Sequence, residues 1–553
     1  MKKNILFINP PSLPFEDIVA GFTSESLRTQ PVSMPLGILY LSACVKRYNQ
    51  VGSVEILDYA LKINEIAKYK NIEDFIIKIA QRDVRSVPDI LAFSLIFSTS
   101  HRFFEVCVNI LKTLWPNAVL IVGGTHATNS AKYLLDNKNV DFVARGEGEE
   151  AFYEFVRQYS ELGYVDIKGI YSKEKIESAA YLDLCDYAHD LDSLPFPDWE
   201  LIDMGAYITA KGRKREIGSS AGKRIASLMT TRGCPFQCTF CSSHTVHGRK
   251  MRFRSVENVI EEVETLHKRF GIKLFIPEDD LFTANQNRVI NLLTALENLG
   301  IPDFELQFPS ALSVSTLNEK VMDALIRAGT KIINIAIESG SEYVQKHIIR
   351  KNCDLQKAKW IVAYLKSKGI MIRCYFIFGF PLETKEQMME TVEYAKSLKA
   401  DWAVFSIAIP LVGSEMYDQF IQMGYITNES DVWSKSFFQR RMFDTKEISA
   451  NELEELTYRV NLDCNFINNP NKINGKYDVA IEFYKEIVSA YPFHIIAFYC
   501  LWECYEALGN FKESEQVNKR IYDLVKTDKR AHDMFVKYND LMPKIEKNKV
   551  LMQ

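Results

Sequence analysis

Strand and helix signals alternate in two blocks of this 553-residue chain, over residues 1 to about 160 and again from Arg224 to about Tyr417. Short apolar runs such as Ile5–Ile8 and Ile90–Leu95 are separated by segments long enough for helices. This alternation is typical of a parallel sheet covered by helices on both faces. A chain of this length is also expected to form several domains rather than one core. We therefore predict an α/β fold over most of the chain.

The first block, residues 1–160, predicts a doubly wound, Rossmann-like parallel sheet. Its strands are expected at Ile5–Ile8, Val54–Leu57, Ile90–Leu95, Val119–Val122 and Phe142–Ala144. Ligands of such sheets bind at the carboxyl ends of the strands. The candidate residues at or just beyond these ends are Pro10, Pro11, Ser98, Gly123, Gly124, Thr125, His126, Gly146 and Glu147. Glycines there let a ligand approach the backbone, although tight turns alone would explain them equally well.

The second block, residues 225–420, contains six strand–helix units. Its strands are expected at Ile225–Met229, Leu274–Ile276, Phe304–Phe308, Ile332–Ile337, Ile372–Phe378 and Ala403–Ile409. Acidic or glycine-containing segments follow several of them, at Glu278–Asp279, Glu338–Ser339, Gly379–Pro381 and Pro410–Ser414. One acidic strand end can simply favour the dipole of the next helix. Four such features on the same side of one sheet instead indicate a binding site.

Three cysteines follow the first strand of this block, with the spacing C-x3-C-x2-C: Cys234, Cys238 and Cys241. Each iron of a 4Fe–4S cluster normally takes one cysteine, so three would leave the fourth iron open to another ligand. His244 or His247 could instead complete a zinc site. The eleven cysteines are odd in number and mostly lie in apolar contexts, which favours a reducing compartment. We therefore expect a cytoplasmic protein.

This motif, with Phe240 directly before the third cysteine, resembles that of the radical S-adenosylmethionine (SAM) superfamily. The resemblance implies a partial (β/α)6 barrel in which the open iron binds SAM, and SAM is then cleaved to a 5′-deoxyadenosyl radical. The SAM-binding residues that it implies are Phe240, Glu278, Asp279, Glu338, Ser339, Gly379 and Pro381.

The first block, read together with this motif, resembles the cobalamin-binding domain that precedes many radical SAM domains. The segments that carry the resemblance are Pro10–Pro11, Pro35–Leu41, Val122–Thr128 and Arg145–Glu149. The strand-end residues given above for the first block are then the expected cobalamin contacts. Because the D-x-H-x-x-G signature is absent, the resemblance implies cobalamin without a protein histidine on the lower face of cobalt. His126 is then expected to be a loop residue near the nucleotide tail.

The remaining segments are predicted to connect and to pack. Residues 161–224 form a connector, and residues 421–553 an all-α region. Two units within about 475–525 repeat at the 34-residue period of tetratricopeptide repeats, and they either bind a partner or only pack, with packing slightly favoured. Cys500 and Cys504, one helical turn apart, are expected to be core residues rather than metal ligands.

Together these features favour a cobalamin-dependent radical SAM enzyme that methylates an unactivated carbon or phosphorus centre of a small-molecule or natural-product intermediate. A cyclase or rearrangement enzyme with the same cofactors is the alternative, and a zinc- or cluster-bearing adaptor acting through the helical repeats is the alternative of another class. No acid–base pair stands out in the sequence.

The expected partners are a small-molecule or carrier-bound substrate, an electron donor such as flavodoxin or ferredoxin, and a protein partner if the C-terminal helices bind one. The net charge of −4 gives no field that favours nucleic acid. No apolar run approaches the ~18–20 residues of a membrane span.

Overall fold

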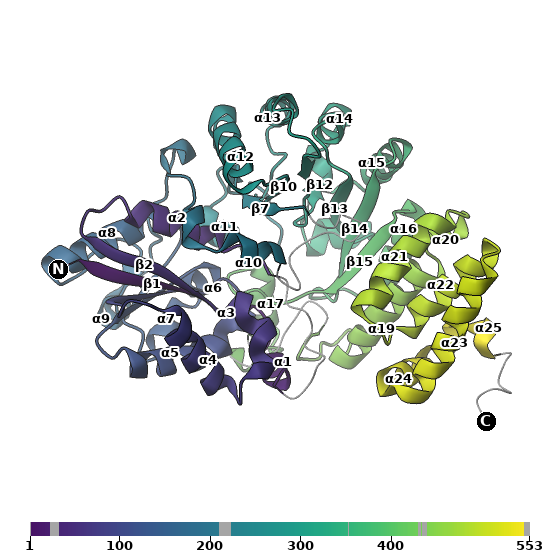
Figure 1. The fold of residues 1–553 in the computed structure, drawn as a ribbon, viewed down its shortest axis with the longest axis horizontal. Helices are drawn as coiled ribbons and strands as arrows, with labels where there is room; N and C mark the ends of the chain where they lie inside the picture. The colour runs from purple at the N-terminus through teal and green to yellow at the C-terminus, as the bar shows by residue number, and fades with distance from the viewer. Residues whose placement is uncertain are drawn as a thin grey trace.

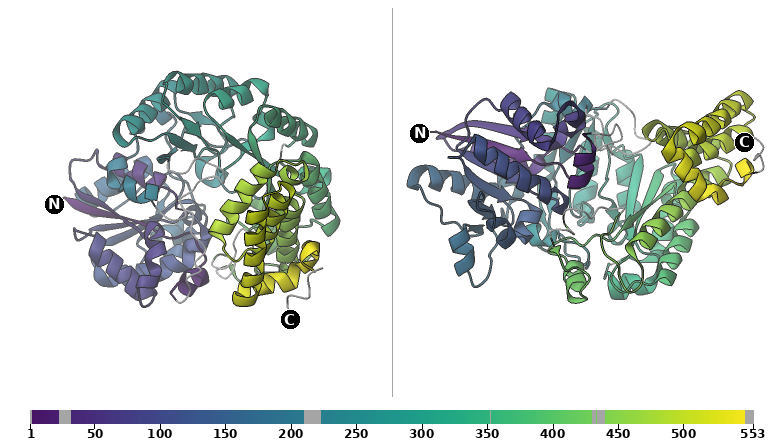
Figure 2. Two further views of the ribbon diagram at one scale, coloured as in Figure 1. Left: turned by 45° about the vertical axis from the view of Figure 1, so that its right-hand side comes forward. Right: turned by 90° about the horizontal axis from the view of Figure 1, so that it is seen from below.

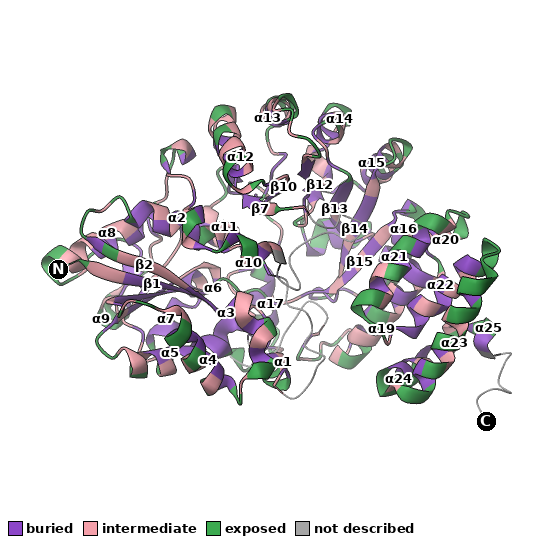
Figure 3. Cartoon of the chain, viewed as in Figure 1, coloured by how far each residue is buried: buried purple, intermediate pink, exposed green. Residues whose placement is uncertain are grey.

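The computed structural model describes residues 2–22, 32–209, 223–351, 353–429, 433 and 440–546. Three regions follow one another across the molecule: an N-terminal α/β region, a central α/β region and a C-terminal helical region (Figure 1). Two further views show the same separation (Figure 2). Buried residues lie on the sheets and on the helix faces that meet them, and exposed residues lie on the outer helix faces (Figure 3).

The predicted N-terminal parallel sheet is confirmed. Its strands are β1 (Lys3–Asn9), β2 (Val51–Asp58), β3 (Ile90–Ser94), β4 (Val119–Gly123), β5 (Phe142–Ala144) and β6 (Ile170–Tyr171). They are ordered β2-β1-β3-β4-β5-β6, and only β6 is antiparallel to its neighbour. The strand order reverses between β1 and β3, which are parallel, and this is where a doubly wound sheet opens a crevice for a ligand.

Helices cover both faces of this sheet. They are α1 (Phe15–Ala20), α2 (Leu36–Val45), α3 (Tyr59–Lys62), α4 (Ile72–Asp83), α5 (His101–Leu114), α6 (Thr125–Asn129), α7 (Ala131–Leu135), α8 (Glu149–Leu162) and α9 (Lys173–Ser178). Met204 and Tyr207 of α10 (Met204–Thr209) pack instead in the core of the central region. Helix α4 begins where the side chain of Asn71 accepts a hydrogen bond from the N–H of Asp74. Its apolar residues Ile72, Phe75, Ile76 and Ile79 recur at helical spacing and are buried. Each such side chain contributes about 1.5–3 kcal/mol by leaving water.

The central region contains two parallel sheets. One is ordered β11-β10-β7 and the other β12-β13-β14-β15. The strands are β7 (Ile225–Leu228), β10 (Leu274–Pro277), β11 (Glu305–Leu306), β12 (Leu312–Ser313), β13 (Ile332–Glu338), β14 (Met371–Phe378) and β15 (Trp402–Ile407). The single strand predicted at 304–308 is thus wrong in extent. The chain leaves the first sheet after Leu306 and joins the second at Leu312, because Pro309 and the positive φ of 65° at Ala311 interrupt an extended strand.

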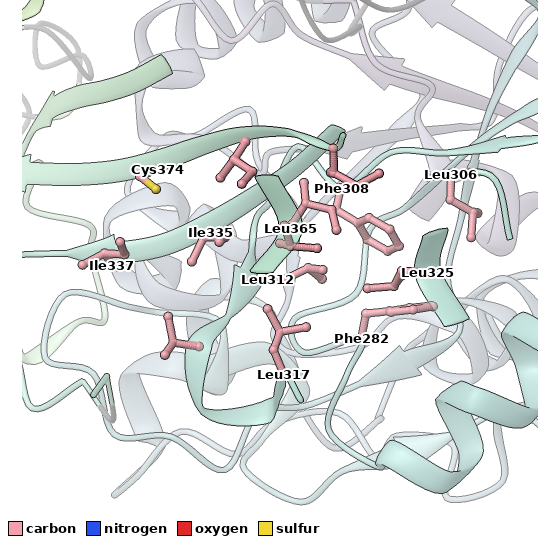
Figure 4. Close-up of a cluster of buried hydrophobic side chains, with 14 of the residues drawn as sticks. Phe282, Leu306, Phe308, Leu312, Leu317, Leu325, Ile335, Ile337, Leu365 and Cys374 are labelled. Carbon is pink, nitrogen blue, oxygen red and sulfur yellow. The ribbon is translucent and has the colours of Figure 1, made fainter. Parts of the chain in front are cut away.

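The outer layer of this region consists of helices that pack on the sheets. They are α12 (Val256–Phe270), α13 (Gln286–Asn298), α14 (Glu319–Arg327), α15 (Leu355–Ser367) and α16 (Lys385–Leu398). Helix α17 (Glu415–Gln422) belongs to a separate cluster, in which Met416 and Phe420 pack with Phe380. Leu306, Leu312, Ile335 and Leu365 pack in one apolar cluster beside the split strand (Figure 4). Cys374 lies in the same cluster, as expected for a buried cysteine without a ligand role.

The C-terminal region contains α19 (Ala450–Leu462), α20 (Pro470–Ile473), α21 (Tyr477–Ala490), α22 (Ile495–Ala507), α23 (Phe511–Thr527), α24 (Lys529–Tyr538) and α25 (Pro543–Glu546). It covers the edge strand β15, where the side-chain amide of Asn465 accepts from the N–H of Ala403 (2.8 Å) and donates to its carbonyl (2.6 Å). Cys500 and Cys504 are buried in its core. No helix in the described part of the chain is long and apolar enough to cross a membrane.

Candidate active site between the two α/β regions

A short hairpin holds the loop that carries the three candidate cysteines. Strands β8 (Thr231–Arg232) and β9 (Arg252–Phe253) pair antiparallel, and α11 (His244–His247) lies within the loop that they close. Gly233, with φ +89°, must be glycine, because a Cβ there would lie 2.4 Å from the carbonyl oxygen of Lys250. The far side of the loop is tied to the central region, since the N–H of Thr239 donates to the carbonyl of Ile349 (3.1 Å).

Cys234, Cys238 and Cys241 are partly exposed, whereas the other eight cysteines of the chain are buried. Among the described residues, no three His, Cys, Asp or Glu side chains are grouped to hold a single metal ion. Zinc needs ligands that converge on one point, whereas thiolates that bind different irons of a cluster do not.

A cavity of about 420 Å³ lies between the N-terminal sheet and this hairpin. The predicted cobalamin residues that line it are Gly123, Gly124, Thr125, Gly146 and Glu147. From the central region Thr231, Arg232, His247, Glu278 and Asp280 line it. Residues proposed for cobalamin and for SAM thus share one cavity.

The wall formed by the N-terminal sheet has room for a large ligand close to the backbone. A Cβ at Gly37 would have no atom within 4 Å, and one at Gly123 would meet only the Cβ of Ala144 at 3.9 Å. Both glycines line the cavity. This cradle of backbone and small side chains fits the flat, bulky ring of cobalamin.

Four of the residues predicted for cobalamin do not line the cavity: Pro10, Pro11, Ser98 and His126. His126 is buried, with its Nδ1 2.9 Å from Ser98 Oγ and its Nε2 3.1 Å from Nδ1 of His101. Burial and the charge of His101 lower the pKa of His126 to about 3. Because both ring nitrogens contact protein groups, this geometry supports the expectation that His126 is not a ligand of cobalt.

The three acidic residues after β10 point in alternate directions, as side chains on an extended chain do. Glu278 and Asp280 line the cavity, and Glu278 accepts a hydrogen bond from Ser227 (3.0 Å). Asp279 is buried on the other side, where it accepts from the N–H and hydroxyl of Thr230 at 2.7 and 2.5 Å. Burial raises the pKa of Asp279 to about 6. Asp280, which the sequence analysis did not select, is therefore better placed than Asp279 to contact a ligand in the cavity.

The two candidate residues at the end of β13, Glu338 and Ser339, also point in different directions. Glu338, with φ 71°, forms a buried ion pair with Lys351 at 2.8 Å. Lys351 also lies 5.8 Å from the ring centre of Phe240, beside the third cysteine. Ser339 instead packs against α16, where its hydroxyl lies 3.0 Å from that of Thr391. Lys351 belongs to no motif that the sequence analysis recognised.

The turn after β14 is held by a buried carboxyl group, that of Glu383. Glu383 accepts hydrogen bonds from the N–H groups of Gly379 (2.7 Å) and Phe380 (3.1 Å). Arg441 donates to the carbonyl of Gly379 at 2.9 Å. Pro381 is buried in the same turn, and the ring of Phe380 lies 5.7 Å from that of Phe240. The turn and the cluster loop therefore meet through their aromatic residues.

A buried ionic network joins the N-terminal sheet to the hairpin. Glu147, in the loop after β5, accepts from Arg232 at 2.8 Å and from Arg252 at 2.9 Å. Glu149 pairs with Arg232, and Nδ1 of His247 lies 2.8 Å from Glu147. Burial raises the pKa of Glu147, but the hydrogen bonds from Arg252 and His247 outweigh it and hold that pKa well below its ordinary value. The sequence analysis predicted Glu147 as a cobalamin contact and missed its partners, which lie in the other region of the chain.

Comparisons with known proteins agree with this two-part site. Residues 228–395 match the radical SAM superfamily, and residues 29–156 match the B12 binding domain. An uncharacterized methyltransferase of Pyrococcus horikoshii is 31% identical, covering 75% of this chain and 83% of that protein. Cytidylyl-2-hydroxyethylphosphonate methyltransferase of Streptomyces wedmorensis is 28% identical, covering 78% of this chain and 86% of that protein.

Solved structures show the same fold. The radical SAM methyltransferase TsrM of Kitasatospora setae, with cobalamin and a 4Fe–4S cluster bound, has a TM-score of 0.58 at 16% identity, covering 77% of this chain and 79% of that chain. The cobalamin-dependent SAM radical enzyme OxsB also has a TM-score of 0.58 at 16% identity, covering 100% of this chain and 82% of that chain.

The fold and the site thus define an enzyme in which a cobalamin-binding domain precedes a radical SAM domain. The chain belongs to the radical SAM superfamily and, within it, to the B12-binding enzymes. Its cofactors are a 4Fe–4S cluster, SAM and cobalamin. The adaptor alternative is therefore not supported.

Proposed function

We propose that this enzyme transfers a methyl group to an unactivated carbon or phosphorus centre of a small-molecule or natural-product intermediate. The observation that carries the proposal is the single cavity that residues of the cobalamin-binding and radical SAM regions line together. Two of the relatives given above are named methyltransferases, and both match most of the chain.

When bound, the cluster and SAM supply a hydrogen-abstracting radical, and cobalamin supplies a transferable methyl group. In this proposal Cys234, Cys238 and Cys241 hold the cluster. Phe240, Glu278, Asp280 and Glu338 form the SAM side of the site, and Gly37, Gly123, Gly124 and Gly146 form the cobalamin cradle. In this proposal both cofactors would lie against the one cavity that the two regions line together, so that a substrate bound there would be within reach of each.

The ionic network between the two regions supports this arrangement, because it fixes their relative position. Arg232 on β8 and Arg252 on β9 lie opposite each other, where the loop that carries the three cysteines begins and ends. Glu147 binds both arginines. Buried charge pairs add stability only when their geometry is good and their hydrogen bonds are satisfied. Retaining such a network at this interface is consistent with a need for a defined orientation.

Ring closure without methyl transfer is a second candidate. Anaerobic magnesium-protoporphyrin IX monomethyl ester cyclase of Cereibacter sphaeroides is 26% identical, covering 60% of this chain and 53% of that protein. Its coverage is lower than that of the two methyltransferases, so methyl transfer is the function that we favour.

A labelling experiment separates the two candidates. The full chain is reconstituted anaerobically with iron, sulfide and hydroxocobalamin, then supplied with SAM carrying a CD₃ group, a low-potential reductant and a panel of candidate acceptors. Methyl transfer predicts products three mass units heavier than with unlabelled SAM. A product that carries no label, formed together with 5′-deoxyadenosine, would favour ring closure or rearrangement.

The partners beyond the substrate stay predictions. An electron donor such as flavodoxin or ferredoxin is required for SAM cleavage in this proposal. For the C-terminal region, packing is the role that the contacts of Asn465 with β15 support, and its relation to tetratricopeptide repeats rests on the sequence spacing alone.

A further inference from the structure

The cavity contains an imidazole held by a carboxylate. His247 lies at the end of α11 and lines the cavity. Its Nδ1 is 2.8 Å from a carboxylate oxygen of Glu147. The two residues are 100 positions apart in sequence and come from different regions of the fold, so no sequence motif marks them. Only the folded structure brings this acid–base pair together.

The contact with Glu147 defines the tautomer of the neutral imidazole. A carboxylate that accepts hydrogen bonds from arginines is ionised and can only accept, so Nδ1 must carry the proton and donate it. Nε2 then presents a lone pair. Because Nδ1 faces Glu147, Nε2 is the ring nitrogen left to meet a ligand in the cavity. An imidazole oriented in this way is the arrangement of a general base whose second nitrogen is held by a carboxylate.

Exposure distinguishes His247 from the rest of the network. Its side chain is 32% exposed, whereas those of Glu147, Arg252 and Arg232 are 2%, 3% and 7% exposed. The charged groups that face it are Glu147 in the loop after β5, Arg252 on β9 and, through Glu147, Arg232 on β8. With Glu149 included, two carboxylates balance two guanidinium groups. His247 is therefore the most exposed of these side chains, and the carboxylate of Glu147 contacts it directly.

We propose that His247 is the proton acceptor of this active site and that Glu147 is its positioning residue. The proposal rests on the methyl-transfer function proposed above, and it assigns the substrate to molecules with an ionisable O–H or N–H group beside the reacting centre. In the step, that bond breaks and its electron pair stays on the substrate atom. A new N–H bond forms at Nε2, and the imidazolium donates to Glu147 until it releases the proton to water.

The first test is spectroscopic and needs no substrate. The full chain is labelled with ¹⁵N-histidine and reconstituted with an oxidised cluster, and the His247 resonances are assigned with His247→Gln. We expect Nδ1 to be protonated and Nε2 to be unprotonated. His267 is a matched internal reference, because its Nδ1 lies 2.8 Å from the carbonyl oxygen of Ile272, which only accepts. Loading with hydroxocobalamin should shift the His247 signals and leave those of His267 in place. A proton on Nε2, or no shift of His247, would overturn the proposal.

The second test measures turnover with an acceptor that the labelled-methyl screen identifies. His247→Gln keeps an amide in the cavity but cannot take up a proton. We expect the amount of methylated product formed per 5′-deoxyadenosine to fall about 10²- to 10⁴-fold relative to the unaltered enzyme. The pH profile of kcat/KM should also lose one ionisation. Methylation at the original rate with an unchanged pH profile would overturn the role of His247.

The two proposals can fail separately. If the unaltered enzyme forms no labelled product, the methyl-transfer function fails, and the proton-acceptor role fails with it. If labelled product forms and His247→Gln forms it equally well, only the role of His247 fails.

Discussion

Gly124 offers a sharp test of how the cobalamin side of the cavity is built. Its φ is +108°, and a Cβ there would lie 2.7 and 2.8 Å from the backbone oxygen and carbon of Leu95. The same oxygen of Leu95 accepts a hydrogen bond from the N–H of His126 at 3.1 Å. A substitution therefore displaces the backbone that joins the ends of β3 and β4, not a flexible side chain.

The expected cost of Gly124→Ala has two parts. A non-glycine residue in this region of φ and ψ costs about 1–3 kcal/mol, and forcing atoms into a filled space costs about 1–3 kcal/mol more. The sum, about 2–6 kcal/mol, should lower the unfolding temperature of the N-terminal region by on the order of 10 °C. Calorimetry on the cofactor-free chain, with the unaltered chain beside it, measures this difference.

Gly123 supplies the matched control, because it is the next residue and lines the same cavity. A Cβ there meets only one atom, at 3.9 Å. The free energy of unfolding of Gly123→Ala should therefore lie within about 0.5 kcal/mol of that of the unaltered chain. Gly123→Leu should instead fill the cradle and weaken cobalamin binding without a matching loss of stability, as a visible-absorbance titration would show. Equal stability of Gly124→Ala and Gly123→Ala would refute this reasoning.

Three further predictions follow from the remaining contacts. Cys238→Ala should lose the cluster iron and the formation of 5′-deoxyadenosine, and retained SAM cleavage would contradict the cluster assignment. Burial raises the pKa of Glu383 to about 8, although the N–H groups of its turn oppose this. The stability that protonated Glu383 contributes is therefore full below its ordinary pKa, about 4.3, and is lost as the pH rises through 8. Glu383→Gln should remove this loss of stability at high pH, whereas Glu383→Ala should lower the free energy of unfolding at every pH. If the Gln variant kept the pH dependence of the unaltered chain, the dependence would not come from Glu383. Asn465→Ala should lower the free energy of unfolding by about 1–3 kcal/mol, because it leaves the N–H and carbonyl of Ala403 unpaired. An unchanged free energy of unfolding in urea would mean that water replaces the amide.

Elements with strong local signals could be predicted closely from the sequence. The strand expected at Phe142–Ala144 has those bounds in the structure, because its short apolar run ends directly at Arg145 and Gly146. Strand β6 was missed, since two residues are too short to show alternation. The split after Leu306 was missed because an apolar run gives no sign of where a strand changes its partner sheet.

The candidate site divides in the same way. The three cysteines and the strand-end glycines could be selected as candidates because their spacing and neighbours carry the signal, and Gly123, Gly124 and Gly146 do line the cavity. The direction in which a side chain points could not be predicted from the sequence. This is why the sequence analysis selected Asp279, although Asp280 lines the cavity. Lys351 was missed for a related reason, since its pairing with Glu338 depends on how the chain returns after β13.

The loop after β5 shows why the two cofactor sites cannot vary independently. Gly146 and Gly148 present backbone to the cavity, while Glu147 between them binds the two arginines of the cluster hairpin. A Cβ at Gly146 would lie 3.3 Å from Leu184 and would also strain a backbone with φ +92°. Any shift of these glycines to accommodate a ligand must therefore move the carboxylate of Glu147. With it would move β8 and β9, the two strands that close the loop of the three cysteines. Because ionic partners this deeply buried tolerate little displacement, the loop after β5 couples the wall of the cavity to the hairpin that holds the three cysteines.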